Sequence, residues 1–428
     1  MKTYRKYPLV LKLISYLLIS LYVISTNISI AHSETAITSK DWPMHFENAQ
    51  HLISERDINL PLKLTWVVNG KNLIKTKLLN DKLYSLHLKK GLLGFVTSRR
   101  DLYLVIMDAK TGKELERMKV SSEDRIHFTD LLVSDKSVYA TTTAVYDDKK
   151  VISKLYAINL TTKEVKQYFD YEWKHEYKSS DTWLTMEGNN LLLTLMNKEN
   201  GDKLFLFDTN TGKLLWQNKG ASKGYLHYSV PVMNRTTVYL TAYVRNLEGP
   251  GFTKCAALDI KNGNNIWEVT IEGEAFASSP VLFKDTIFTV TLKGRKSNVY
   301  AIANTDGSIL WREESENNFS GAPAIENDTL YVFGRPHTVA FNLANGGKLK
   351  EYITSDRITK SVYLAKDTFF LKAPHSIEFY NKDTGALIAT YAPVLNGGFY
   401  DQIYDVIASD KMIYALLYNG DIYTYSSS

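Results

Sequence analysis

Residues 203–216 read KLFLFDTNTGKLLW, and this stretch decides the fold. An apolar and aromatic run ends at Asp208, a short polar turn ends at Gly212, and a second apolar run ends at Trp216. Asp and Asn side chains initiate tight turns by bonding to nearby backbone, and Gly supplies the positive φ that such turns require. The stretch therefore predicts two short strands joined by a hairpin turn.

The hairpin pattern recurs along the chain. Its copies are residues 106–112, 157–163, 206–212, 257–263, 301–307, 340–346 and 379–385. A second pattern alternates with it, a polar turn followed by a pair of apolar or aromatic residues. The second residue of that pair falls at positions 84, 139, 192, 239, 288, 331, 370 and 414. Each period of about 45 residues thus holds two hairpins, or four short strands.

Four short strands in each period are typical of one blade of a β-propeller. The segments are rich in aromatic and β-branched residues, and they lack the 3.6-residue apolar period of helical repeats. We therefore predict an all-β fold, an eight-bladed β-propeller with four antiparallel strands per blade.

The eighth period lacks a fourth strand, because residues 421–425 correspond to a third strand and no further strand follows. Leu62–Val68 (LKLTWVV) has the pattern of the missing strand, and its Leu-Thr-Trp resembles the Leu-Leu-Trp that ends at Trp216. Pairing this segment with the last sheet would close the ring and remove an exposed sheet edge. We predict that the last blade is closed by this N-terminal strand.

The first 33 residues have the pattern of a secretory signal peptide. Lys2, Arg5, Lys6 and Lys12 precede an apolar run from Leu13 to Ile24, and Ala31-His32-Ser33 offers a cleavage site. The run is shorter than the roughly 20 apolar residues of a transmembrane helix. We expect a signal peptide at 1–33, an N-terminal extension at 34–58 and the propeller at 59–428, with an uncleaved N-terminal anchor as the alternative. The expected location is extracytoplasmic: secreted, periplasmic or on the cell surface.

Charge and cysteine content exclude some classes of function. The chain carries a net charge of +5, but residues 1–33 hold four of the positive charges and no acidic residue. The remaining chain is close to neutral and gives no electrostatic case for binding nucleic acid. Cys255 is the single cysteine, so an internal disulfide is excluded.

Three segments resemble the propeller repeat named after pyrroloquinoline quinone enzymes. They are residues 206–216, residues 257–267 (ALDIKNGNNIW) and residues 301–311 (AIANTDGSILW). The resemblance implies that a tryptophan four residues after the turn glycine docks between adjacent blades. Trp216, Trp267 and Trp311 hold that position, whereas Glu116, Gln167, Lys350 and Ala389 replace the tryptophan in other blades.

Two branches of this superfamily differ in chemistry. Quinone dehydrogenases carry a vicinal disulfide and a calcium ion, and one cysteine cannot form such a disulfide. The chain is more similar to the propeller lipoprotein of the outer-membrane β-barrel assembly machinery, whose branch lacks the cofactor site. It departs from that lipoprotein because no lipobox cysteine is present.

No strong catalytic motif is present, and we predict no catalytic residue, metal site or cofactor. The nine histidines lack zinc-ligand spacing, and neither a phosphate loop nor a nucleophile elbow occurs. Asp208 begins an alternation of oxygen-bearing residues like that of a calcium loop. The twelfth position of such a loop requires Glu, and Lys219 occupies it, so we interpret the segment as a repeat turn.

The predicted function is binding or scaffolding by an exported, monomeric, non-catalytic propeller. We expect a protein, peptide or glycan partner, and membrane contact only through an uncleaved signal or a partner. The segments before the innermost strands should surround one mouth of the central channel. Their ligand-binding candidates are Phe128, Trp183, Tyr225, His227, Phe276, Phe319, Lys360 and Tyr400. Two alternatives stay open: a divergent quinoprotein dehydrogenase or other propeller enzyme, and an extracytoplasmic sensor domain on an uncleaved anchor.

Overall fold

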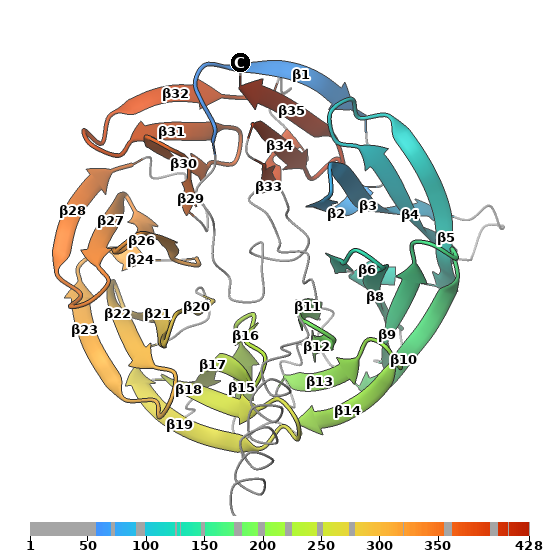
Figure 1. Cartoon of the computed structure of the whole chain (residues 1–428), viewed down its shortest axis with the longest axis horizontal. Helices are drawn as coiled ribbons and strands as arrows, with labels where there is room; N and C mark the ends of the chain where they lie inside the picture. Colours follow the sequence, from blue (N-terminus) through green and yellow to red (C-terminus); the bar gives the residue numbers. More distant parts are fainter. Residues whose placement is uncertain are drawn as a thin grey trace, which may run out of the picture. The chain divides into compact units, whose positions relative to one another are not determined.

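Eight antiparallel sheets follow one another along the chain and form a ring of blades (Figure 1). The computed structural model describes residues 57–69, 73–90, 99–124, 126–128, 130–146, 150–174, 182–195, 202–218, 225–245, 251–273, 279–319, 321–354, 362–393, 401–409 and 411–427. These residues all belong to one unit of the chain, Thr38–Ser428. The predicted eight-bladed propeller is confirmed. The predicted signal peptide and most of the predicted N-terminal extension lie outside the described residues.

The first four blades comprise strands β2 to β19. Blade 1 contains β2 (Leu73–Leu79), β3 (Lys82–Lys90), β4 (Arg99–Asp108) and β5 (Glu114–Asp124). Blade 2 contains β6 (Ile126–Phe128), β7 (Leu131–Val133), β8 (Ser137–Val145), β9 (Lys150–Asn159) and β10 (Val165–Lys174). Blade 3 contains β11 (Thr182–Glu187), β12 (Asn190–Leu195), β13 (Lys203–Asp208) and β14 (Lys213–Asn218). Blade 4 contains β15 (Tyr225–Tyr228), β16 (Val232–Met233), β17 (Thr237–Arg245), β18 (Phe252–Asp259) and β19 (Asn265–Glu272).

The other four blades comprise the remaining strands. Blade 5 contains β20 (Val281–Phe283), β21 (Thr286–Lys293), β22 (Lys296–Ala303) and β23 (Ile309–Ser315). Blade 6 contains β24 (Asn318–Phe319), β25 (Ala324–Glu326), β26 (Thr329–Arg335), β27 (His337–Asn342) and β28 (Lys348–Ile353). Blade 7 contains β29 (Val362–Leu364), β30 (Thr368–Lys372), β31 (Ile377–Asn381) and β32 (Leu387–Tyr391). Blade 8 contains β33 (Ile403–Ala408), β34 (Met412–Leu417), β35 (Ile422–Ser427) and β1 (Leu62–Val68).

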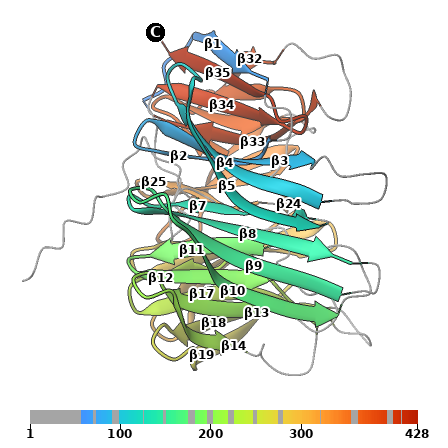
Figure 2. The ribbon, with the colours of Figure 1, turned by 90° about the vertical axis from the view of Figure 1, so that its right-hand side faces the viewer.

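In blades 1 to 7 the strands run in sequence order from the centre of the ring outward, whereas in blade 8 the outermost strand is β1 (Figure 1). In blades 2, 4 and 6 the innermost position is shared by two short strands that pair with the same neighbour. Strands such as β8, β9 and β13 run between the two faces of the ring (Figure 2). The described ranges contain no helix of the length and apolar character needed to span a membrane.

Blade 8 is closed by the strand nearest the N-terminus, as predicted. Strand β1 pairs antiparallel with β35, from Leu62 opposite Ser427 to Val68 opposite Ile422. Figure 1 shows β1, in blue, at the outer edge of the dark red strands of this blade. The Leu62 amide also donates a hydrogen bond to the Tyr391 hydroxyl at 2.7 Å, which joins β1 to blade 7. Strand β1 therefore supplies the fourth strand of blade 8 and closes the ring.

The turns between the third and fourth strands have the chemistry that the sequence predicts. Asp208 Oδ1 accepts hydrogen bonds from the Thr211 amide at 2.8 Å and the Thr211 hydroxyl at 3.0 Å. Gly212 adopts a φ of 70°, a left-handed conformation that glycine takes without strain. In blade 2, Lys163 adopts the same conformation with a φ of 63°. Most of the repeat hairpins are therefore Asx turns that end in a left-handed residue, and in blade 5 Ala303 takes the place of Asp or Asn.

The core consists of layers of side chains between neighbouring blades. The apolar residues that mark the repeat in the sequence lie on the second strand of each blade, and all of them are buried: Tyr84, Tyr139, Leu192, Tyr239, Phe288, Tyr331, Phe370 and Tyr414. Burial of aromatic and aliphatic surface is the main favourable term in folding, and here it accrues at every blade interface.

Candidate binding site between blades 3 and 4

The residues that the sequence predicts at a channel mouth come from several blades. Phe128 lies on β6, Trp183 on β11, and Tyr225 and His227 on β15, each on the innermost strand of its sheet. Phe319 on β24 is fully buried, and its ring packs edge-on against Phe341 with centroids 6.1 Å apart. Phe276, Lys360 and Tyr400 lie outside the described residues. A ligand-binding role for this set stays a prediction.

Three tryptophans connect each of blades 3, 4 and 5 to the next blade. Trp216 Nε1 donates to the Ile260 carbonyl at 2.7 Å, and Trp267 and Trp311 make the same bond to Asn304 and Leu343, both at 2.9 Å. Each acceptor lies in the turn of the following blade. A Cβ atom on Gly263 in that turn would come within 2.8 Å of the Trp216 ring, so the ring covers the glycine closely.

Tyrosine hydroxyls make the equivalent bond from blades 2 and 6. The Tyr168 hydroxyl donates to the Thr209 carbonyl at 3.2 Å, and the Tyr352 hydroxyl donates to the Lys382 carbonyl at 3.0 Å. The sequence pattern had pointed to Gln167 and Lys350, which precede these tyrosines by one and two residues. Tyr168 lies at a shift in strand register between Gln167 and Phe169, which a sequence repeat alone does not reveal.

Blade 1 contacts the turn between β9 and β10 of blade 2 through an ion pair instead of an aromatic ring. Glu116 forms an ion pair with Lys163 at 2.7 Å, and Lys163 is the residue that replaces the turn glycine in blade 2. Where no ring covers the turn, a long side chain can occupy the left-handed position.

Trp66 of β1 covers the turn of blade 1 in the same way, because a Cβ atom on Gly112 would lie 2.7 Å from its ring. Trp66 Nε1 is buried and has no hydrogen-bond partner among the described residues. The Tyr414 hydroxyl instead donates to the Ala109 carbonyl in this turn at 3.2 Å. The contact between blades 8 and 1 thus keeps the packing but transfers the hydrogen bond to another side chain.

The interface between blades 2 and 3 is filled by aromatic rings. Phe205 on β13 lies 4.7 Å from Phe169 and 5.2 Å from Tyr171, measured between ring centroids, and both partners come from β10. Phe207 lies 5.2 Å from Phe169 in an edge-on arrangement. Tilted and edge-on pairs of this kind add to the stabilisation from burial alone.

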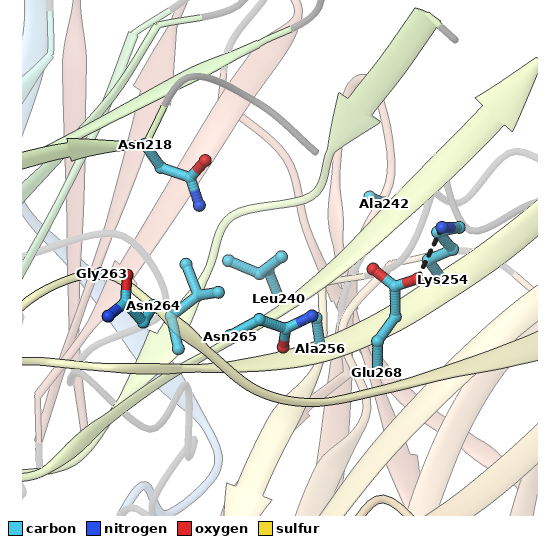
Figure 3. Close-up of a pocket in the computed structure, with 10 residues that line it drawn as sticks. Asn218, Leu240, Ala242, Lys254, Ala256, Gly263, Asn264, Asn265 and Glu268 are labelled. Atoms are coloured by element: carbon cyan, nitrogen blue, oxygen red, sulfur yellow. Dashed lines mark hydrogen bonds and ion pairs between the residues drawn. The ribbon is translucent and has the colours of Figure 1, made fainter. Parts of the chain in front are cut away.

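The interface between blades 3 and 4 instead contains a pocket of about 240 Å³ (Figure 3). Its lining combines an apolar centre with polar and charged ends: Leu240, Ala242, Ala256, Leu258, Gly263, Asn218, Asn264, Asn265, Lys254 and Glu268. Lys254 and Glu268 form an ion pair at 2.5 Å at the end of the pocket away from Asn264 (Figure 3). An apolar centre with a few converging polar groups is the usual composition of a binding site.

The residues that line this pocket are not among the candidates predicted from the sequence. The signal lies in a comparison of matched positions in the repeat, because Ala256 stands where blades 2, 3 and 5 carry Tyr156, Phe205 and Tyr300. The other blades carry smaller or charged residues there: Val105, Val339 and Glu378.

A buried lysine lies at the inner edge of the ring. Lys77 on β2 is almost wholly buried, and burial lowers the pKa of its ammonium group, an effect opposed in part by Asp130 and Asp405. Asp130 Oδ2 accepts a hydrogen bond from the Leu184 amide at 2.9 Å, which links blades 2 and 3 near the centre of the ring. In the described part of the chain, no three His, Cys, Asp or Glu side chains gather as ligands for a metal ion.

Comparison with known proteins supports the repeat type. A family model described as outer membrane protein assembly factor BamB matches residues 200–370, a segment that begins before β13 and ends within β30. No curated protein sequence matches the chain significantly.

Solved structures share the fold at low sequence identity. BamB from Moraxella catarrhalis is 14% identical, with a TM-score of 0.56 over 86% of this chain and 100% of that one. The designed protein Ika8 is 13% identical, with a TM-score of 0.57 over 87% and 100%. The quinohemoprotein alcohol dehydrogenase ADHIIG from Pseudomonas putida HK5 is 11% identical, with a TM-score of 0.57 over 91% and 80%. The chain is thus similar to propellers with the pyrroloquinoline-quinone-like repeat, BamB among them, as its repeats predict.

Proposed function

We propose that this chain is exported and acts outside the cytoplasm as a non-catalytic β-propeller that binds a protein partner. The observation that carries the proposal is the pocket between blades 3 and 4. It interrupts the aromatic packing that fills the neighbouring interface, and it lies between rigid sheets that side chains such as Trp216 hold together. A preformed pocket on a rigid scaffold binds without a large cost in ordering entropy.

The resemblance to BamB and the N-terminal sequence support the location. The matched family is described as an outer membrane assembly factor, and the matched segment includes every residue that lines the pocket. The predicted signal peptide at residues 1–33 would direct the chain out of the cytoplasm.

Co-purification tests the proposal. The full-length chain with an affinity tag is made in its own host, crosslinked, and recovered from the cytoplasmic, membrane and extracytoplasmic fractions. We expect a reproducible protein partner in a fraction outside the cytoplasm, in near-stoichiometric yield. The control is a chain that lacks residues 62–68, which cannot close the ring and should lose that partner.

Two results would overturn the proposal. Recovery of the chain only from the cytoplasm would exclude export. Saturable binding of pyrroloquinoline quinone with calcium, together with oxidation of an alcohol by an electron-accepting dye, would make the chain an enzyme.

A further inference from the structure

We infer that the pocket between blades 3 and 4 binds an aromatic side chain, Phe or Tyr, from an extended segment of the partner protein. The inference rests on the proposed function, because it names the chemistry by which the partner is held. It follows from a comparison with the blades that carry an aromatic ring at the position of Ala256, which are blades 2, 3 and 5.

The third strand of blade 4 carries a small residue where its neighbours carry an aromatic ring. Phe205, Ala256 and Tyr300 each lie three residues before the first residue of the following turn, which is Asp208, Asp259 or Ala303. Phe205 and Tyr300 are fully buried between blades, as a large ring at this position should be. Ala256 is buried as well, but it has a small side chain, and the pocket lies against it.

The fourth strand of blade 3 carries a polar residue where that of blade 2 carries an aromatic ring. Phe169 pairs with Leu155, and Asn218 pairs with Leu204, and both leucines lie four residues before their turn. Phe169 and Asn218 therefore occupy matching places on the fourth strands of blades 2 and 3. Between blades 2 and 3 the facing residues are Phe169 and Phe205, whose ring centroids lie 4.7 Å apart. Between blades 3 and 4 the corresponding pair is Asn218 and Ala256.

The size of the pocket favours one side chain over a larger ligand. Its volume of about 240 Å³ is below the range of roughly 300–1,000 Å³ typical of sites for drug-sized molecules. The apolar lining of Leu240, Ala242 and Leu258 suits the face of a ring. Aromatic side chains that insert into such pockets are the residues that dominate binding energy at protein interfaces.

The polar ends of the pocket suit a polypeptide rather than a free aromatic compound. The side-chain amide of Asn265 carries both donors and an acceptor, which match the N–H and C=O groups that flank a side chain in an extended segment. At the other end the Lys254–Glu268 ion pair is only partly exposed and offers polar atoms to a tyrosine hydroxyl.

Titration with a fluorinated amino-acid amide tests the inference. N-acetyl-4-fluoro-L-phenylalanine amide is added to the full-length chain and followed by ¹⁹F NMR, with N-acetyl-L-leucine amide as competitor. We expect saturable binding that the leucine compound displaces poorly. Ala256→Phe places a ring in the pocket, as Phe205 does in blade 3, and should weaken binding at least about ten-fold.

Two further variants secure the interpretation. Ala256→Val fills part of the pocket with a smaller change, so it decides the matter if Ala256→Phe does not fold; it too should weaken binding. Leu215→Ser removes an exposed leucine from β14, outside the pocket, and should leave binding unchanged. Equal affinity of the parent chain and Ala256→Val, or preference for the leucine amide, would overturn the inference.

The crosslinking experiment separates this inference from the proposed function. If the folded Ala256→Phe chain retains the protein partner of the parent chain, the function stands and the pocket is not the aromatic site. If the parent chain has no partner outside the cytoplasm but still binds the fluorophenylalanine amide, the pocket stands and the proposed function fails.

Discussion

At the scale of single residues, the ring rests on one contact made in several chemical forms. A side chain from a fourth strand covers the turn of the next blade and donates a hydrogen bond to a carbonyl there, with tryptophan in some blades and tyrosine in others. Glu116 and Lys163 replace that contact by an ion pair. The geometry of the repeat is therefore kept while the chemistry of the contact varies.

Trp216 and Trp66 separate the packing of this contact from its hydrogen bond. Trp216→Phe removes the bond to the Ile260 carbonyl, whereas Trp66→Phe removes a similar volume and breaks no bond to a described residue. We expect Trp216→Phe to lower the free energy of unfolding by about 1 kcal/mol more than Trp66→Phe does. Guanidinium denaturation of both variants measures the difference. Equal losses would show that the indole hydrogen bond contributes nothing net.

Sequence could predict the docking tryptophans but not all their substitutes. Trp216, Trp267 and Trp311 keep a constant distance from the turn glycine, so the pattern alone locates them. In blade 2 a register shift between Gln167 and Phe169 brings Tyr168 over the turn instead of Gln167. Such a shift depends on pairing across the sheet, which the order of residues in one strand does not contain.

At the scale of elements, the hairpin between the third and fourth strands is constrained twice. Gly263 needs a left-handed backbone, with a φ of 71°, and it also lies directly beneath the Trp216 ring. The hairpin thus sets the turn within one blade and the distance to its neighbour. Only a residue without a side chain meets both conditions where an aromatic ring covers the turn.

Gly188 provides a matched control for Gly263. It also has a positive φ, of 56°, but a Cβ atom there would meet no other atom within 4 Å. Gly188→Ala should cost about 1 kcal/mol from backbone strain alone. Gly263→Ala should cost at least about 2 kcal/mol, because the new methyl group also displaces the Trp216 ring. Thermal unfolding midpoints of the two variants test this order, and an equal cost would contradict close contact between ring and turn.

At the scale of the whole molecule, closure of the ring depends on a strand far from its partner in sequence. The Thr65 hydroxyl donates to the Ser426 hydroxyl at 2.9 Å across a separation of 361 residues. The sequence predicted this closure because one period lacked a strand and one unassigned strand remained. The pocket between blades 3 and 4 requires Asn218 and Ala256 to meet across an interface between two repeats, so the pattern within a single repeat does not predict it.

Two truncations test the closing strand. A chain that begins at Asp57 keeps β1, and a chain that begins at Gly70 loses it. We expect the first to unfold cooperatively at the temperature of the full-length chain. The second should melt at a clearly lower temperature and aggregate, because β35 is then an exposed edge. Equal melting of the two chains in a calorimeter would show that the ring is sealed in another way.

The pairing of β1 with β35 also determines when, during synthesis, the ring can close. The ribosome makes β1 more than 350 residues before β35, so β1 lacks its partner while all the blades between them are synthesised. A stop codon ahead of β35 would therefore do the same harm as loss of β1, because either change leaves one of the two strands without its partner.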